Sequence, residues 1–150
     1  LCAKFVIQNK AYACLSEDMD LFVYGCPRIL RYFSLIQKNV VIYYLDKIIK
    51  ELNLTFKEFK DICIVSGTDY NINSNTNLYK TLEYFKVFKG TNESEFFHWL
   101  IKNTDYIEDT KKLSNTCKLF KFDISNNYNV INNYNKLNRV KIRELLYTIK

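Results

Sequence analysis

Three aspartates are the residues of this sequence best suited to chemistry. Asp18 and Asp20 follow an apolar stretch one residue apart, and Asp69 comes just after a second apolar segment. If the chain stays extended after the first stretch, this spacing directs both carboxylates to one side of a strand end. Carboxylates without histidine or cysteine suit a hard divalent cation such as Mg²⁺, which prefers oxygen ligands and keeps several waters. Taken alone, the same aspartates are also ordinary turn formers and helix caps, and that interpretation stays open.

The elements around these aspartates predict an α/β fold in which strands come early and the second half is helical. Residues 1–9 have helical spacing with Asn9 as a left-handed cap, and Thr55 with Glu58 has capping-box spacing ahead of another helix. Strands are predicted at Ala11–Leu15, Ile29–Phe33 and Asn39–Tyr44. Further helices are predicted over Leu45–Leu52, from Thr55 toward Gly67, over Leu78–Gly90, and near 94–102, 110–121 and 136–149, with polar loops at 71–77 and 123–135.

Charge is unevenly distributed along the 150 residues, whose net charge is +6. Residues 1–75 carry nine basic and eight acidic side chains, a net charge of +1, whereas residues 110–150 carry nine basic and two acidic side chains, a net charge of +7. A basic tail suits contact with a phosphate backbone, although charge alone favours the plainer explanation, lysine-rich codon usage. The bias toward Asn, Lys, Ile, Tyr and Phe fits an A/T-rich genome, such as that of a large DNA virus or an A/T-rich eukaryote.

The remaining residue types exclude several classes of protein. Five cysteines, an odd number without a C-x-x-C pair, predict neither a disulfide framework nor a zinc site, and indicate a reducing intracellular compartment. His98 is the single histidine, which argues against a histidine-based catalytic group. The apolar runs are too short for a membrane span. The chain starts at Leu1 inside a helical pattern with no signal peptide, so we expect an excerpt of a longer protein.

Two longer motifs contain the three aspartates. Residues Ala13–Pro27 read A-C-L-S-E-D-M-D-L-F-V-Y-G-C-P, and residues Phe59–Tyr70 read F-K-D-I-C-I-V-S-G-T-D-Y. They resemble T-E-D-M-D-x-L-x-F-G-x-P and F-x-D-x-C-I-L-x-G-x-D-Y of the flap endonuclease (XPG) superfamily of structure-specific 5′ nucleases. The resemblance spans about residues 1–90, and two spaced motifs of this length are specific.

The resemblance implies a metal site and a place for this chain within it. Asp18, Asp20 and Asp69 correspond to carboxylates that hold one of the family's two divalent metals, Mg²⁺ with Mn²⁺ as a substitute. The other acidic ligands are expected before Leu1, so these residues alone should hold half an active site and show little or no cleavage. We expect the three carboxylates to converge within a few ångströms of each other, around a cation with ligand distances of about 2 Å. Their mutual repulsion should raise the pKa of at least one.

The resemblance also implies how the chain is organised. The expected fold is the carboxyl-terminal part of a PIN-like 5′-nuclease domain, a short mixed sheet with flanking helices, followed by a helix–turn–helix-like region. Residues 1–70 would form the nuclease core, 71–90 a degenerate helix–three-turn–helix, and 91–150 a helical basic tail.

One departure from the family concerns the binding of DNA. Where the family has a Gly-Ile-Gly turn near duplex phosphate, this chain reads Asn75-Thr76-Asn77 and is one residue shorter. Asn75 and Asn77 can adopt left-handed or cap conformations, so a similar turn at the start of the next helix is expected. Lys80 and Lys86 are candidate phosphate contacts, although exposed helix lysines are usually only solvated.

Three functions remain open after this comparison of motifs. The first is a Mg²⁺-dependent nuclease that cuts DNA at 5′ flaps or single-strand/duplex junctions, in the nucleus or a viral replication compartment. A sliding clamp is a further candidate partner, through regions outside these residues. The second is a non-catalytic relative that binds nucleic acid or protein, favoured by loss of the glycine turn and opposed by retention of the aspartates. The third keeps the chemistry but acts on RNA 5′ ends.

Overall fold

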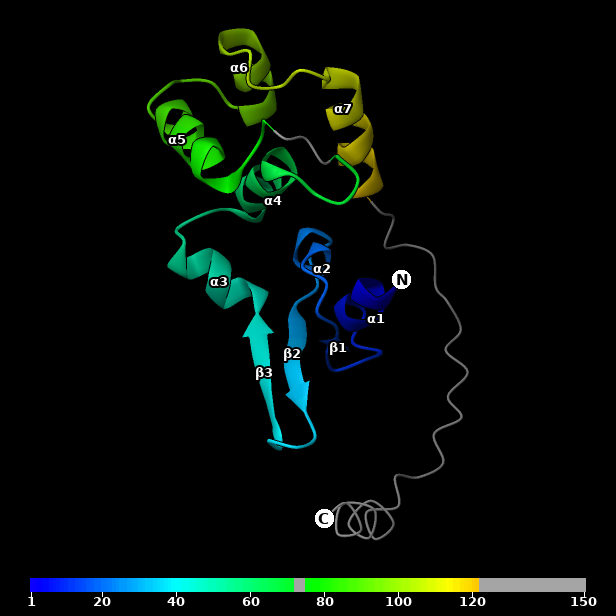
Figure 1. The fold of residues 1–150 in the computed structure, drawn as a ribbon. Coiled ribbons are helices and arrows are strands. Elements are labelled where there is room, and N and C mark those ends of the chain that lie inside the picture. The colour runs from blue at the N-terminus through cyan, green and yellow to red at the C-terminus, as the bar shows by residue number, and fades with distance from the viewer. Residues whose placement is uncertain (72–74, 122–150) are drawn as a thin grey trace, which may run out of the picture.

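The chain folds into a small mixed sheet and a group of helices, as the computed structural model in Figure 1 shows. The structure describes residues 1–71 and 75–121. The elements in chain order are α1 (Cys2–Ile7), β1 (Cys14–Leu15), α2 (Asp20–Val23), β2 (Arg28–Ser34), β3 (Asn39–Tyr44), α3 (Leu45–Glu51), α4 (Phe56–Ser66), α5 (Leu78–Lys89), α6 (Phe96–Asn103) and α7 (Thr110–Leu119).

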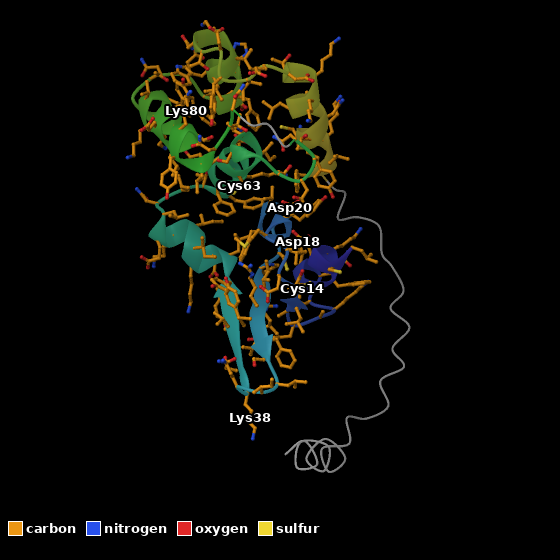
Figure 2. The ribbon with its side chains drawn as sticks, in the orientation of Figure 1. Cys14, Asp18, Asp20, Lys38, Cys63 and Lys80 are labelled. Carbon is orange, nitrogen blue, oxygen red and sulfur yellow. The ribbon has the colours of Figure 1, made fainter. Side chains whose placement is uncertain are left out.

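The sheet has the order β1-β2-β3, with β1 parallel to β2 and β2 antiparallel to β3. The second and third predicted strands are confirmed, and they form a hairpin that points away from the helices, with Lys38 near its end (Figure 2). The first predicted strand is much shorter than expected, since only Cys14 and Leu15 pair with β2. One reason is that the Tyr12 carbonyl accepts a hydrogen bond from Arg28 Nε at 2.5 Å, so a side chain takes the place of a strand partner.

Two apolar clusters form the core, and the short helix α2 lies between them. One cluster joins α1, α2 and the sheet, with the members Ala3, Val6, Leu21, Phe22, Cys26, Ile29 and Leu45. The other joins α4 to the later helices, with the members Val23, Ile62, Ile64, Val65, Phe85, Phe88, Phe96, Trp99, Leu100, Tyr106, Leu113 and Phe120. Tyr24, directly after α2, packs against both clusters. The segment after Asp20 therefore connects the sheet to the helices.

The predicted helix ends are confirmed where the signal is local. Thr55 Oγ1 accepts the Glu58 N–H, and the Glu58 carboxylate accepts the Thr55 N–H, which completes the capping box at the start of α4. Gly67 ends α4 with φ 114°, a value that favours glycine. Asn9 has φ 54°, as expected for a left-handed cap after α1.

The helices predicted near 94–102 and 110–121 are confirmed as α6 and α7. The loop predicted at 123–135 and the helix at 136–149 lie outside the described residues. Within 1–71 and 75–121, no helix is long and apolar enough to cross a membrane.

Candidate metal site

Asp18 and Asp20 lie in a tight turn that leads into α2. The Asp18 carboxylate accepts the Asp20 N–H at 2.9 Å, and the Asp18 N–H donates to Ser16 Oγ at 3.1 Å. Asp20 is the first residue of α2. The expectation that these residues continue an extended strand is wrong, because local side-chain hydrogen bonds compete with strand geometry directly after β1.

Glu17 anchors this turn to β2. One of its carboxylate oxygens pairs with Arg31 Nε at 3.2 Å, and the other accepts the Tyr32 N–H at 2.6 Å. Arg31 also donates to the Glu17 carbonyl at 3.1 Å. This role of Glu17 was not predicted, and the available sequence signal is an acidic residue directly before Asp18 together with an arginine in the next strand.

Asp69 is held by a second polar turn, which follows α4. The Asn71 side-chain carbonyl accepts hydrogen bonds from both the N–H and the hydroxyl of Thr68, and its amide donates to the Ile64 carbonyl at 2.7 Å. Thr68 and Asn71 are both buried. These buried hydrogen bonds fix the backbone on each side of Asp69. The sequence did not predict them, because they depend on the path of the chain after Gly67.

The two turns face each other across one open pocket of about 520 Å³. Its lining comes from Glu17, Asp18, Met19, Asp20, Ser66, Gly67, Thr68 and Asp69. Burial raises the pKa of the Asp20 carboxyl, and the negative charges of Asp18 and Asp69 raise it further. The expected rise of at least one pKa is confirmed, with burial as the largest cause. None of the ion pairs among the described residues involves these three aspartates.

The donors in this pocket fit a hard divalent cation by their chemistry. The carboxylates of Asp18, Asp20 and Asp69 interact electrostatically, and no ion pair among the described residues neutralises them, so a divalent cation would supply the missing positive charge. Among residues 1–71 and 75–121, however, no three His, Cys, Asp or Glu side chains lie close enough together to hold a metal ion. The expected convergence around one cation is thus corrected to a shared pocket that the three aspartates line.

The residues predicted to bind DNA, namely Asn75 and Asn77 of the turn and the candidate phosphate contacts Lys80 and Lys86, do not line this pocket. Lys80 lies on α5, away from Asp18 and Asp20 (Figure 2), with Nζ 5.4 Å from the centre of the Tyr106 ring. Lys86 is exposed on the same helix.

Asn77 takes one of its two expected conformations, the helix cap. Its φ of −153° is extended, and its side chain accepts the Lys80 N–H at 2.9 Å. The Asn77 N–H donates to the Tyr106 hydroxyl at 2.9 Å, and the Asn75 side-chain amide donates to the Glu108 carboxylate. In the turn that was expected near phosphate, partners within the protein therefore occupy both the Asn77 N–H and the Asn75 side-chain amide.

Comparisons with known proteins agree with the motifs. Residues 1–69 match the family described as the XPG I-region. Flap endonuclease 1-A of Oryza sativa subsp. japonica is 42% identical over 72 residues, which cover 46% of this chain and 19% of that protein. Flap endonuclease 1-2 of Paramecium tetraurelia is 35% identical over 94 residues, covering 59% of this chain and 24% of that protein. The chain thus spans about a fifth to a quarter of the length of these relatives.

The fold also has a solved counterpart. Flap endonuclease-1 from Methanococcus jannaschii is similar with a TM-score of 0.60 and 19% identity, over 79% of this chain and 35% of that one. This likeness confirms the predicted fold class, a short mixed sheet with flanking helices.

Proposed function

We propose that the chain belongs to the flap endonuclease (XPG) superfamily, which residues 1–69 resemble, and that it is part of a metal-dependent, structure-specific 5′ nuclease. Its substrate would be DNA with a 5′ flap or a single-strand/duplex junction. Such DNA arises where genomes are copied, so we expect the protein to act in the nucleus or in a viral replication compartment.

One observation carries the proposal, namely that Asp18, Asp20 and Asp69 line a single pocket without any basic partner among the described residues. In our proposal these three hold a Mg²⁺ ion, with Mn²⁺ as a substitute, together with acidic ligands from elsewhere in the full-length protein. When bound, such ions supply a water activated for attack and neutralise charge on the phosphate.

Different residues of this chain would position the individual ligands of the proposed metal site. Glu17 and Arg31 keep the turn of Asp18 against β2, and the buried pair of Thr68 and Asn71 keeps Asp69 at the end of α4. Asp20 would bind the cation in its ionised form, which burial and the charges of Asp18 and Asp69 disfavour by raising its pKa. These contacts prepare the site before metal arrives.

We assign the DNA-binding part of the proposal to the start and exposed face of α5. Lys80 and Lys86 would contact phosphates there, while Asn75 and Asn77 would shape the turn ahead of the helix. Because Asn77 uses its N–H on Tyr106, lysine charge rather than turn amides would supply most of the affinity.

The test is cleavage of a 5′-flap DNA by the full-length protein in Mg²⁺, with a blunt duplex of the same sequence as the reference. Asp18→Asn and Asp69→Asn should each lower cleavage by about 10³-fold or more, equivalent to roughly 4 kcal/mol, with flap binding retained. Glu51→Gln changes the same charge at an exposed position on α3 and should cut like the parent. Full cleavage by the Asp18→Asn, Asp69→Asn double variant would refute the mechanism.

The non-catalytic alternative keeps one observation in its favour, the Asn75–Asn77 turn whose Asn77 N–H is already bonded within the protein. A full-length protein that binds flaps but never cuts them in Mg²⁺ or Mn²⁺ would establish that alternative. Substituting an RNA flap for the DNA flap in the same assay tests the preference for RNA 5′ ends.

A further inference from the structure

Three aromatic rings connect the two turns of the acidic pocket to the end of α7. Tyr24 directly follows α2, which begins at Asp20, and Tyr70 directly follows Asp69. Both rings contact Phe120, with centroid distances of 4.6 Å for Tyr24 and 5.8 Å for Tyr70. Residues that adjoin the two halves of the pocket therefore meet on one side chain that lies 50 positions beyond Tyr70.

The two tyrosines also interact with each other. Burial and, after it, the neighbouring Tyr70 hydroxyl raise the pKa of Tyr24 to about 12, and Tyr24 is partly buried between the two apolar clusters. The Tyr24 N–H donates to the Asp20 carbonyl at 3.0 Å, one helical turn back, so a shift of Tyr24 displaces the backbone of Asp20. On the other side, Tyr70 is covalently next to Asp69.

Phe120 is in turn fixed from two directions. It is 1% exposed within the helical cluster, and its carbonyl accepts a hydrogen bond from Lys60 Nζ of α4 at 2.6 Å. The residue that carries the third ring is thus anchored to α4, the helix that precedes the turn of Asp69.

We propose that Tyr24, Tyr70 and Phe120, together called the aromatic clamp, are positioning residues that set the separation of Asp20 and Asp69 across the pocket. The inference rests on the proposed function and extends it to α7, which lies beyond the I-region match of residues 1–69. The two aspartates repel each other in the absence of a cation, and a rigid link between their turns opposes that repulsion. The family motif quoted above has phenylalanine in place of Tyr24, so the hydroxyl pair distinguishes this chain from that pattern.

The decisive measurement is Mn²⁺ affinity of the full-length protein, by titration without DNA. Tyr24→Phe removes only the hydroxyl pair and should weaken Mn²⁺ binding by about 10-fold, the lower end of what outer partners of metal ligands contribute. Phe120→Ala should weaken it at least as much, and Phe120→Tyr, which keeps a ring, should restore most of it.

A matched control exists elsewhere in the chain, because the neighbouring Tyr12 hydroxyl raises the pKa of Tyr44 and neither residue lines the acidic pocket. Tyr44→Phe should leave Mn²⁺ affinity unchanged. With flap DNA present, the activity of Tyr24→Phe should return toward the parent value at saturating Mn²⁺, with no change in the KM for DNA. A general loss of structure would produce neither result.

The outcomes separate this inference from the function it rests on. If Tyr24→Phe binds Mn²⁺ as the parent does while Asp69→Asn does not bind it, the clamp is refuted and the nuclease proposal stands. If Asp69→Asn also leaves Mn²⁺ affinity unchanged, the metal site itself is refuted. Should Phe120→Ala fail to fold, Tyr24→Phe and its Tyr44→Phe control decide the question.

Discussion

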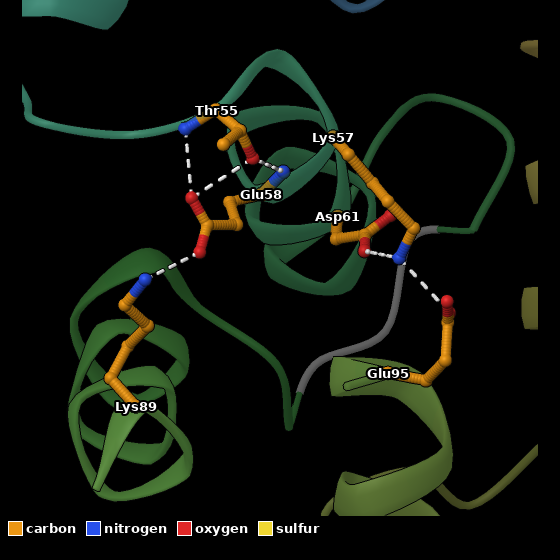
Figure 3. Close-up of polar contacts among 6 residues, drawn as sticks. All are labelled: Thr55, Lys57, Glu58, Asp61, Lys89 and Glu95. Carbon is orange, nitrogen blue, oxygen red and sulfur yellow. Dashed lines mark hydrogen bonds and ion pairs between the residues drawn. The ribbon is translucent and has the colours of Figure 1, made fainter. Parts of the chain in front are cut away.

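The molecule holds two groups of carboxylates that differ in what lies beside them. In the acidic pocket, Asp18, Asp20 and Asp69 face one another across two turns. On α4 and α6, in contrast, Asp61 and Glu95 share the ammonium of Lys57, at 3.1 Å and 2.9 Å, and Glu58 pairs with Lys89 of α5 at 2.7 Å (Figure 3). We call Glu58, Asp61 and Glu95 the lysine-paired group.

Burial alone does not distinguish these groups. Burial raises the pKa of Asp20, where neighbouring aspartates add to the effect, and it raises the pKa of Asp61, where Lys57 offsets only part of it. The pKa of Glu58 is lowered, because hydrogen bonds from Lys89 and Thr55 outweigh its burial. The lysines connect separate helices, so that group stabilises the fold, whereas uncompensated carboxylates in a pocket are typical of functional sites.

The comparison is tested most strongly by adding metal. Mg²⁺ at about 100 times its Kd should stabilise the full-length protein by about 2.7 kcal/mol, since it binds only the folded state. Asp69→Asn should lose this gain, while Asp61→Asn should keep it even if its starting stability differs. Denaturant unfolding with and without Mg²⁺ measures both. An Asp61→Asn variant that no longer responds to Mg²⁺ would remove the distinction between the two groups.

Removing the shared lysine should have the next largest effect. Lys57→Met leaves the Asp61 carboxylate buried without its cation, so we expect the free energy of unfolding to fall by about 2 kcal/mol at neutral pH. This is less than the roughly 3–5 kcal/mol typical of fully buried ion pairs, because Lys57 is half exposed. The loss should shrink on acidification, since the raised pKa lets Asp61 take up a proton early. Lys102→Met, which breaks an exposed pair with Glu93, is the control and should change stability by less than about 0.5 kcal/mol. A pH-independent loss for Lys57→Met would contradict this account.

What could be predicted from sequence depended on how local each signal was. The capping box of Thr55 and Glu58, the stop at Gly67 and the strands over Ile29–Phe33 and Asn39–Tyr44 all depend on neighbours within a few residues, and all are confirmed. The extended backbone expected at Asp18 and Asp20 was wrong, because two local patterns compete there, namely strand alternation and hydrogen bonds from side chains to the backbone.

The contacts that support the site were out of reach for a different reason. Lys57 meets Glu95 38 positions away, and Tyr70 meets Phe120 across 50 positions. Neither pairing leaves a periodic trace in the sequence, because tertiary packing alone brings the partners together. The resemblance identified which aspartates share a pocket, but the turns that hold them became visible only in the structure.

Glu58 offers a test with the opposite pH sign to Asp20. Its lowered pKa means that its stabilising contribution is present above the ordinary value of 4.5 and is lost as pH falls through the folded value. Glu58→Gln keeps a side chain suited to the capping box but loses the ion pair with Lys89, so we expect a loss of about 1 kcal/mol at neutral pH. Unfolding across a pH series should show the two proteins converging in acid. A constant difference at every pH would mean that the ion pair contributes nothing.

The smallest expected effect is a change in stability on substituting Asp20, and its sign should reverse when metal is added. Because the pKa of Asp20 is raised, the folded state holds its proton more tightly than the unfolded chain, and the ionised form lowers stability at neutral pH. Without metal, Asp20→Asn should therefore be more stable than the parent by about 0.5 kcal/mol, and the difference should vanish as pH falls toward the ordinary value of 3.8. With Mg²⁺ the order should reverse, since only the parent keeps the full charge that the cation binds. Glu51→Gln, an exposed change of the same charge, should show neither effect. If Asp20→Asn is less stable than the parent both with and without Mg²⁺, then Asp20 belongs with the stabilising carboxylates of the lysine-paired group, and the acidic pocket is a structural feature.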